Sequence, residues 1–222
     1  YDGISGHKTI LAMNHLLINS SYKNARTSLD YFKYKPTLKN KRKPDEKVDS
    51  EKLGYDFFTD RLGKDGVRFI TCRSDTGTGK TTSFKTFMKN HPKERCISIV
   101  SRISLGLEQY ETFNNAGIDT GFYENENFSP GDNYIVQIDS LLKLQYWVNQ
   151  GATCGYSIFL DEWNSIVKHL FTSDTMTKNG VRIQIMDLLV DIIRDAKYVI
   201  MTDADISDQS LRFLDFVLDS PD

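Results

Sequence analysis

The sequence lacks long apolar runs, paired cysteines and clustered histidines, and each absence excludes a class of protein. No run approaches the roughly 20 apolar residues that a membrane-spanning helix needs, and the start, YDGISGHKTI, lacks the cationic stretch and apolar core of a secretory signal. The 3 cysteines form no C-x-x-C pair and the 4 histidines have no metal-binding spacing, so neither a disulfide framework nor a zinc site is indicated. We therefore expect a soluble, intracellular protein without a membrane partner.

Composition and charge limit the size of the fold and the kind of partner. A chain of 222 residues with 39% hydrophobic residues can build one well-buried domain, or one domain with an appendage. Its net charge of −2 hides an asymmetry: residues 1–55 carry 11 Lys and Arg against 6 Asp and Glu, whereas residues 156–222 carry 6 against 12. The first part could contact a polyanion, and the second would repel one unless a metal ion intervened. Because the chain starts at Tyr1 without a methionine, we expect a piece of a longer polypeptide.

Short apolar runs alternate with longer amphipathic segments from Val67 onward. This alternation is typical of βαβ units, and near-continuous apolar runs are typical of strands buried on both faces. The predicted strands are residues 67–72, 96–101, 134–138, 156–161 and 198–202, with 118–123 as a sixth candidate. The predicted helices are residues 80–89, 104–115, 140–148, 162–171, 181–195 and 207–218. We therefore expect residues 63–222 to form one α/β domain with a doubly wound, mainly parallel sheet flanked by helices.

Residues 1–62 lack this pattern and are predicted to form a separate N-terminal segment, partly helical and partly basic and extended. Residues 7–19 and 51–62 have helical patterns, and residues 22–49 between them are rich in lysine and interrupted by prolines. Over residues 31–43, aromatic side chains interleave with lysines, as in surfaces that stack bases and bind phosphates. A solvated linker to an upstream domain is the alternative explanation.

The stretch RSDTGTGKTTSF, residues 73–84, lies between a predicted strand and a predicted helix. Its glycines let backbone N–H groups point inward, its lysine can reach the β- and γ-phosphates of a nucleotide, and the next threonine can bind Mg²⁺. Ser74 stands where the pattern G-x-x-x-x-G-K-[ST] has its first glycine, and a chance glycine-rich turn is the alternative. Lys80 is also predicted to act in catalysis. The expected nucleotide-binding residues are Asp75, Thr76, Gly77, Thr78, Gly79, Lys80, Thr81 and Thr82.

An acidic pair follows another predicted buried strand in SIFLDEW, residues 157–163. We expect Asp161, at the end of the strand, to bind Mg²⁺ together with Thr81, and Glu162 to orient or deprotonate the attacking water. Acids also favour helix starts because they suit the helix dipole, which is the alternative explanation. Hydrolysis of ATP or GTP is the predicted chemistry, and the absence of an N-K-x-D tetrapeptide that would read guanine favours ATP.

Five segments, taken in order and spacing, resemble the first motor lobe of herpesvirus-type origin-binding helicases. They are similar as well to the related helicase or primase–helicase proteins of large DNA viruses and mobile elements, all in helicase superfamily 2. The segments are CRSDTGTGKTTSF, IVSRISLGLEQYETF, NYIVQIDSLLKL, YSIFLDEWNSIVKHLFTSDTM and YVIMTDADISDQSLRFL. The resemblance covers residues 67–216 and implies a RecA-like P-loop NTPase fold. It also implies an ATP-dependent DNA helicase that acts in viral DNA replication.

The resemblance further implies which residues contact nucleic acid. Ser101, Arg102 and Ser104 match the motif that grips the phosphates of the tracking strand, which hydroxyls and an arginine can do without reading sequence. The alternative is an arginine that pairs with a neighbouring carboxylate. A second set faces the nucleic acid in the family, although polar residues at a strand end also cap helices. This set consists of Gln137, Asp139 and Ser140.

One family motif is altered in this chain. The motif that couples hydrolysis to DNA movement matches MTDADIS, and Asp205 stands where the family has a threonine. Thr202 and Asp203 precede it, and Asp203 can hydrogen-bond the region of the second-motif acid. Further carboxylates near Asp161 and Glu162 would change the affinity for Mg²⁺ or the coupling, so we expect slow turnover.

A motor of this kind hydrolyses ATP between two lobes, and the second lobe supplies an arginine finger. Only 6 residues follow Phe216, so we expect the second lobe elsewhere in a longer polypeptide, which could also contain a primase domain. This chain alone should bind nucleotide but hydrolyse little and unwind nothing. The implied partners are single-stranded or forked DNA and other replication proteins.

The sequence leaves two other functions open. A nucleoside or nucleotide kinase also couples a phosphate loop to a parallel sheet, but it adds an arginine-rich lid, whereas Arg182, Arg194 and Arg212 are widely spaced. A nucleotide-binding scaffold without turnover would fit Asp205 and the missing second lobe. Preference for DNA or RNA, unwinding polarity, the origin sequence and the oligomeric state do not follow from the sequence.

Overall fold

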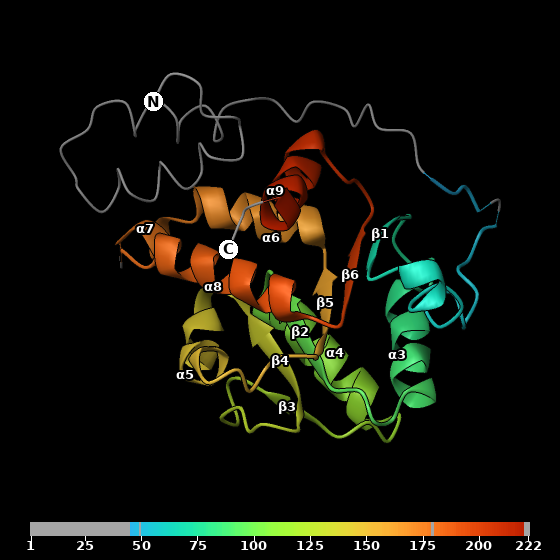
Figure 1. Ribbon diagram of the computed structural model, residues 1–222, viewed down its shortest axis with the longest axis horizontal. Coiled ribbons are helices and arrows are strands. Elements are labelled where there is room, and N and C mark those ends of the chain that lie inside the picture. Colours follow the sequence, from blue (N-terminus) through green and yellow to red (C-terminus); the bar gives the residue numbers. More distant parts are fainter. Residues whose placement is uncertain (1–44, 49, 179, 220–222) are drawn as a thin grey trace.

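A computed structural model describes residues 45–48, 50–178 and 180–219 of the chain (Figure 1). The predicted helix 7–19 and the basic stretch 31–43 lie outside the described residues and stay predictions. In the described part, no helix combines the length and the apolar character that spanning a membrane requires. From residue 69 onward the described chain folds into a single sheet with helices on both faces.

The sheet has six parallel strands in the order β1-β6-β5-β2-β4-β3. Their bounds are β1 Phe69–Arg73, β2 Cys96–Val100, β3 Thr120–Phe122, β4 Asn133–Gln137, β5 Ser157–Asp161 and β6 Tyr198–Asp203. Every residue of β2 and β5 is buried, because helices cover both faces of the central strands. The predicted doubly wound parallel sheet is confirmed, including the sixth strand.

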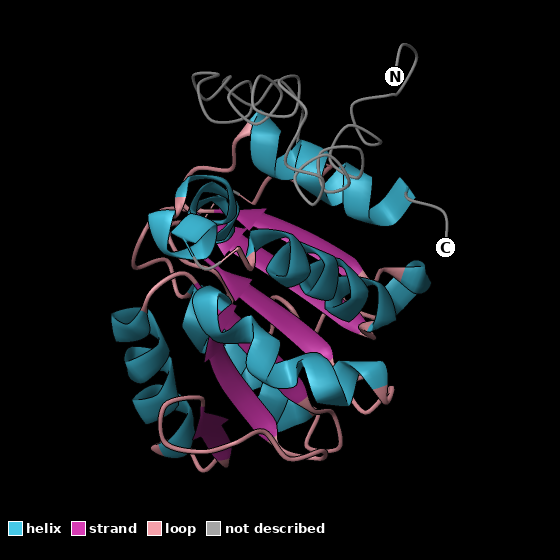
Figure 2. Ribbon diagram, turned by 90° about the vertical axis from the view of Figure 1, so that its left-hand side faces the viewer, coloured by secondary structure: helices cyan, strands magenta, loops and turns pink. Residues whose placement is uncertain are grey.

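The helices form two layers, one on each side of the sheet (Figures 1 and 2). The helices are α3 Lys80–Asn90, α4 Ile103–Asn114, α5 Gln145–Asn149, α6 Trp163–Thr172, α7 Asp174–Lys178, α8 Arg182–Asp195 and α9 Asp208–Asp219, with 3-10 helices η1 Lys64–Gly66 and η2 Ile138–Leu144. Crossovers between parallel strands are right-handed, so the direction of travel across the sheet decides the face. The chain therefore places α3 and α4 on one face on its way from β1 to the edge strand β3, and α5, α6 and α8 on the other face as it returns to β6.

The predicted helix over residues 51–62 is wrong. Residues 55–63 form turns whose few backbone hydrogen bonds do not make the continuous ladder of a helix. Tertiary contacts direct this segment: the backbone N–H of Leu53 donates to Thr78 O at 2.8 Å, and Phe58 is fully buried in the core. A helical spacing of apolar residues was therefore overridden by packing against a distant part of the chain.

The predicted helix over residues 140–148 is two elements, η2 and α5. The buried residues of η2 are Ile138, Leu141 and Leu144, which recur every third position. A 3-10 helix has three residues per turn, so this spacing places all three side chains on one face. The short helix α7 has no counterpart among the predictions.

Aromatic packing fixes the elements that meet at the carboxyl end of β5. Phe84 of α3 stacks on Phe159 of β5, with ring centroids 4.0 Å apart and 10° between the ring planes. Trp163, the first residue of α6, is fully buried, and its Nε1 donates to Ser210 O of α9 at 3.2 Å. These contacts thus join the middle of β5 to α3, and the start of α6 to α9.

Candidate active site

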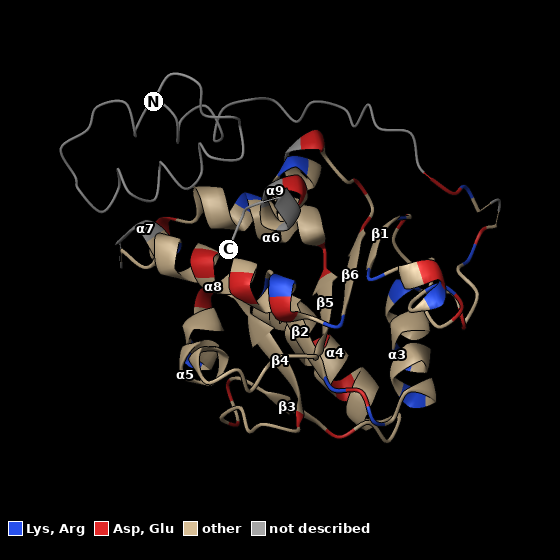
Figure 3. Cartoon of the chain, viewed as in Figure 1, with Lys and Arg blue, Asp and Glu red and all other residues tan. Residues whose placement is uncertain are grey.

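Every charged residue in the six described strands stands at the last position of its strand. Arg73 ends β1, Asp161 ends β5 and Asp203 ends β6, and these three strands are neighbours. Figure 3 accordingly shows the bodies of the strands in tan. The carboxyl ends of parallel strands lie at one edge of the sheet, where open α/β folds bind ligands. The candidate site is built on this edge.

The predicted phosphate loop connects β1 to α3. Gly77 and Gly79 have φ angles of 80° and 94°, in the left-handed region that glycine adopts without steric cost. Lys80 begins α3, and its Nζ donates to the backbone O of Ser74 at 2.6 Å and of Asp75 at 2.9 Å. The ammonium group is therefore held against the loop, at the positive end of a helix, where an anion bound by the loop amides would meet it.

Ser74, which replaces the first glycine of the loop pattern, takes part in the loop. Thr78 Oγ1 lies 2.9 Å from Ser74 Oγ and 2.8 Å from Asp75 O, so its proton can be donated to either. A glycine would offer no side-chain acceptor here. Ser74 therefore stabilises the loop through a side-chain hydrogen bond. The next residues, Asp75, Thr76 and Gly77, are exposed, so the tip of the loop is open to solvent.

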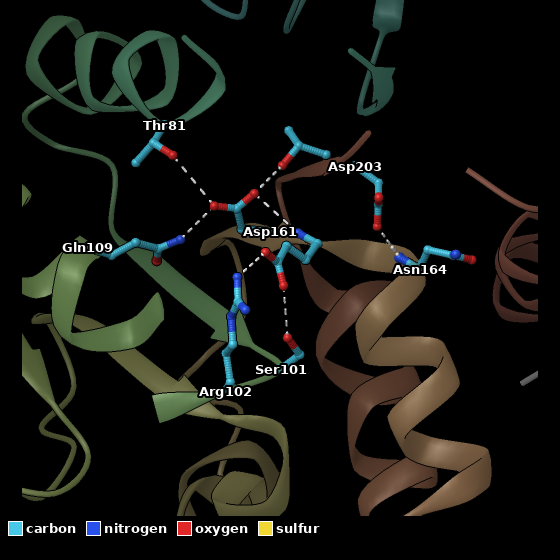
Figure 4. A network of polar contacts seen from close by, with 9 residues as sticks. Thr81, Ser101, Arg102, Gln109, Asp161, Asn164 and Asp203 are labelled. Carbon is cyan, nitrogen blue, oxygen red and sulfur yellow. Dashed lines mark hydrogen bonds and ion pairs between the residues drawn. The ribbon is translucent and has the colours of Figure 1, made fainter. Parts of the chain in front are cut away.

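Asp161 is almost fully buried and joins four parts of the chain. Its Oδ2 accepts from Gln109 Nε2 at 3.0 Å and, over a longer contact of 3.5 Å, from Thr81 Oγ1 (Figure 4). Its Oδ1 accepts from Thr202 Oγ1 at 2.7 Å and from the backbone N–H of Glu162 at 3.1 Å. The structure thus brings the start of the phosphate-loop helix, the acidic pair and the end of β6 to one carboxylate.

Gln109 is a site residue that the sequence analysis missed. It is fully buried in α4, where Ser98 Oγ of β2 donates to its Oε1 at 2.6 Å while its amide donates to Asp161. The other buried residues of α4 are Gly106 and Phe113, so Gln109 lies on the apolar face of the helix. A polar residue at an apolar position of the helical pattern was the signal that could have identified it.

Glu162 has a different environment from its neighbour. Its backbone is left-handed, with φ 56° and ψ 51°, a conformation that costs a residue other than glycine about 1–2 kcal/mol. Its Oε1 accepts from Arg102 Nη2 at 2.6 Å and its Oε2 from Ser101 Oγ at 3.3 Å (Figure 4). The pairing of Arg102 with a neighbouring carboxylate, an alternative open from the sequence, is present in the structure. Ser104 is exposed on the first turn of α4.

The second predicted nucleic-acid set lies at the end of β4 and the start of η2. Asp139 Oδ2 pairs with Nε2 of His169 at 2.8 Å and accepts from Gln137 Nε2 at 3.3 Å, and Tyr123 OH donates to Gln137 Oε1 at 2.8 Å. Burial raises the pKa of Tyr123 to about 12, so this hydroxyl keeps its proton at neutral pH. Gln137 precedes η2 without a side-chain capping bond, and Ser140 is partly buried.

The altered motif at the end of β6 contacts α6 and β1. Asp203 Oδ2 accepts from the backbone N–H of Asn164 at 2.7 Å (Figure 4), and its Oδ1 from the backbone N–H of Asp205 at 3.0 Å. The Asp205 side chain is exposed and lies 3.5 Å from Arg73 Nη2. The carboxylates of Asp203 and Asp205 therefore contact groups other than Asp161. Of the three predicted coupling residues, Thr202 is the one whose side chain donates to Asp161.

The oxygen atoms near the loop fit a magnesium ion that a nucleotide brings. Mg²⁺ prefers one or two protein oxygens together with substrate phosphates over a cage made only of protein. The Thr81 hydroxyl and the Asp161 carboxylate supply oxygens of this kind beside Lys80. Among the residues that the structure describes, no group of three or more His, Cys, Asp or Glu side chains could hold a metal ion by itself.

The predicted site residues fall into two adjoining groups. The residues around Asp161 and Glu162 form one group, and the residues around Asp139 form the other. Gln137 Nε2 lies 3.5 Å from Ser101 O, which places the two predicted nucleic-acid sets beside each other. His169 and Asn164, which partner Asp139 and Asp203, were not identified from the sequence because they contact these acids only through the fold.

Two curated relatives come from Acanthamoeba polyphaga mimivirus. One is named for replication origin binding and is 28% identical over 167 residues, which cover 72% of this chain and 21% of the relative. The other is named as a helicase and is 26% identical over 151 residues, which cover 65% of this chain and 14% of the relative. The chain thus spans about a fifth of the length of the first relative and less of the second.

Two solved structures align with the chain at low sequence identity. A Dbp5 variant of S. cerevisiae, bound to ADP and partner proteins, aligns over 72% of this chain and 44% of its own, with a TM-score of 0.50 and 15% identity. The SWI2/SNF2 ATPase core of Sulfolobus solfataricus, in complex with dsDNA, aligns over 67% and 31%, with a TM-score of 0.45 and 14% identity. The likeness to Dbp5 shows the fold alone, which is the RecA-like α/β fold.

A family model described as origin of replication binding protein matches residues 63–218. The match covers more than half of the chain and includes both groups of predicted site residues. The chain therefore belongs to the origin of replication binding protein family.

Proposed function

We propose that this chain is the first, nucleotide-binding motor lobe of an ATP-dependent DNA helicase that acts in DNA replication of the viral type. The observation that carries the proposal is the approach of Thr81 to Asp161, with Oγ1 and Oδ2 3.5 Å apart beside Lys80. Thr81, next to the predicted phosphate loop, and Asp161 of the acidic pair are 80 positions apart in the chain, and the fold brings them together at one edge of the sheet. Family membership and the RecA-like fold support the same function.

The loop and the acidic pair divide the work on the nucleotide. The backbone amides from Asp75 to Thr82 and the ammonium of Lys80 would bind the β- and γ-phosphates. Magnesium, held by Thr81 and Asp161 together with phosphate oxygens, would neutralise the charge that develops on the transferred phosphoryl group. Glu162 would orient the attacking water or take its proton.

Nucleic acid would be bound by the neighbouring groups of the same edge. Ser101, Arg102 and Ser104 would bind backbone phosphates of single-stranded or forked DNA, as hydroxyls and guanidinium groups do without reading sequence. The adjoining set would extend this contact along the strand. It consists of Gln137, Asp139 and Ser140.

The end of β6 would couple hydrolysis to movement. Thr202 donates to Asp161, and Asp203 accepts from the first turn of α6, so a shift of this strand end reaches both the metal-binding acid and a helix. Asp205 would act through Arg73 and not through the metal. The second lobe, with its arginine finger, would lie outside these 222 residues, as the greater length of the relatives supports.

Replacement of the loop lysine tests this function. In the complete protein, Lys80→Ala should lower DNA-stimulated ATP hydrolysis by about 100-fold, the usual size of the effect when one donor to the reacting group is removed. Lys89→Ala, at the exposed far end of the same helix, should leave turnover unchanged. Undiminished turnover in Lys80→Ala would reject the proposal, and ADP formation that needs a nucleoside but ignores DNA would favour a kinase.

A further inference from the structure

The N-cap residue of helix α4 and a residue in the middle of the helix contact the two acids of the site. Arg102, which immediately precedes α4, donates to Glu162, and Gln109, two turns further along, donates to Asp161 (Figure 4). Gly106 lies between them, and a Cβ at this position would come within 2.8 Å of the Phe122 ring. The helix therefore lies very close to the sheet, and both residues contact their acids from one closely packed element.

The two contacts differ in how easily they can be exchanged. Gln109 and Asp161 are buried, so breaking their hydrogen bond would leave a buried group unsatisfied. The side chains of Arg102 and Glu162 are 61% and 33% exposed, and such an ion pair contributes only about 0.2–1 kcal/mol. Water or a competing anion can replace the partner of Arg102 at little cost, whereas Asp161 stays in place.

The contact of Glu162 with Arg102 and Ser101 competes with its proposed role. Both carboxylate oxygens accept hydrogen bonds, Oε1 from the guanidinium and Oε2 from the hydroxyl. An oxygen that accepts from the guanidinium or the hydroxyl has one lone pair fewer for a water molecule, and the hydrogen bond to the guanidinium also fixes the direction of the carboxylate. In this arrangement Glu162 is held by the same two residues that are proposed to bind nucleic-acid phosphates.

We propose that Arg102 is a positioning residue that keeps Glu162 from the attacking water until a nucleic-acid phosphate takes the guanidinium. The inference rests on the proposed function and specifies how nucleic acid regulates the same site. A phosphate offers Arg102 charge-assisted and bidentate hydrogen bonds, for which guanidinium is well shaped. Once Arg102 turns to the phosphate, Glu162 is released while Gln109 still fixes Asp161. Hydrolysis is thereby restricted to the protein that holds a strand.

The test is ATP turnover of the complete protein with and without a short oligothymidylate strand. Arg102→Ala should raise turnover without DNA by about two- to five-fold, the factor that matches a surface ion pair, and should reduce stimulation by DNA to nearly none. Arg102→Gln, which keeps most of the side chain's bulk, should behave in the same way. Arg212→Ala, an exposed arginine on α9, is the matched control and should change neither rate.

A second pair of variants separates release of Glu162 from other effects. In a Glu162→Gln background, Arg102→Ala should no longer raise turnover without DNA, because there is no carboxylate to release. Unchanged turnover without DNA in both single Arg102 variants, with stimulation lost, would reduce Arg102 to a phosphate contact and overturn the inference, while the proposed function would stand. If Lys80→Ala left DNA-stimulated ATP hydrolysis undiminished, the proposed function itself would be overturned.

Discussion

Adjacent acids at the end of β5 differ in burial, and this difference suits the two different roles proposed for them. Asp161 is 4% exposed and accepts from buried donors, whereas the Glu162 side chain is 33% exposed and accepts from an exposed arginine. Buried hydrogen bonds are costly to leave unmade and exposed ion pairs are weak. Asp161 is therefore a fixed group and Glu162 an adjustable one, as a metal ligand and a regulated base would require.

At the same scale, we predict that Gln109→Leu weakens magnesium binding. The substitution removes the amide that orients Asp161 and leaves Ser98 Oγ without its acceptor. The magnesium concentration for half-maximal ATP turnover should rise about tenfold, the lower range for loss of a partner behind a metal ligand. Stability in urea should fall by about 1–3 kcal/mol.

Ser98→Ala is the control for this substitution. It removes the hydroxyl that donates to Gln109 but keeps the hydrogen bond from the Gln109 amide to Asp161, so the magnesium concentration for half-maximal turnover should change much less. An unchanged midpoint in Gln109→Leu, at any loss of stability, would show that Gln109 only fills the core.

At the scale of elements, α4 depends on one glycine for its distance from the sheet. A Cβ at Gly106 would lie 2.8 Å from Phe122 Cε2 and 3.3 Å from Val100 Cγ2. Phe122 is fully buried between the rings of Tyr110 and Tyr123, with centroids 5.9 and 4.8 Å away, so it cannot swing aside. The helix and the acids it contacts would have to shift instead.

We predict that Gly106→Val destabilises the protein by about 1–2 kcal/mol. Overpacking of the core costs about 1–3 kcal/mol, and the better helix propensity of valine returns only about 0.5 kcal/mol. Chemical denaturation measures the difference. Glu108→Val, at an exposed position of the same helix, shares the β-branched side chain without the clash and should cost under about 0.5 kcal/mol. A Gly106→Val protein at least as stable as the unaltered one would contradict close packing at this glycine, because helix propensity alone favours valine over glycine.

The pattern of apolar residues predicted the bounds of the strands well but failed for one segment. The predicted strands agree with the observed ones to within one or two residues, because strands buried on both faces leave a continuous apolar run in the sequence. The sequence of residues 51–62 has a helical spacing of apolar residues, but the structure of this segment is set by its contacts with the predicted phosphate loop and with the core. Local spacing cannot record a contact whose partner lies elsewhere in the chain.

At the scale of the whole molecule, the three thiols report on different parts of the fold. Cys154 is exposed, whereas Cys72 and Cys96 are buried. Burial raises the pKa of all three thiols, most strongly that of Cys96, and the Asp195 carboxylate adds to the effect at Cys154. Only the thiolate reacts with an alkylating reagent.

We predict that one thiol of this fold reacts with iodoacetamide under native conditions. Cys154 should react first, and its rate should continue to rise with pH beyond about 8.5, the usual thiol pKa, because a raised pKa delays formation of the thiolate. Cys72 and Cys96 should react only when the sheet opens. Mass spectrometry of the labelled peptides separates them, and Cys154→Ser is the control. Labelling of Cys96 as fast as that of Cys154 would contradict the packing of β2.

The sequence alone determined the α/β class and the order of strands along the chain, and it predicted a phosphate loop and an acidic pair as site residues. These follow from apolar runs and from residues close together in the chain, so local patterns carry them. Only the tertiary structure decided that Gln109 supports Asp161, that Arg102 holds Glu162 and that Asp205 turns to Arg73. Each of these pairs joins segments that meet because parallel strands end at one edge of the sheet, and a one-dimensional pattern does not contain that distance.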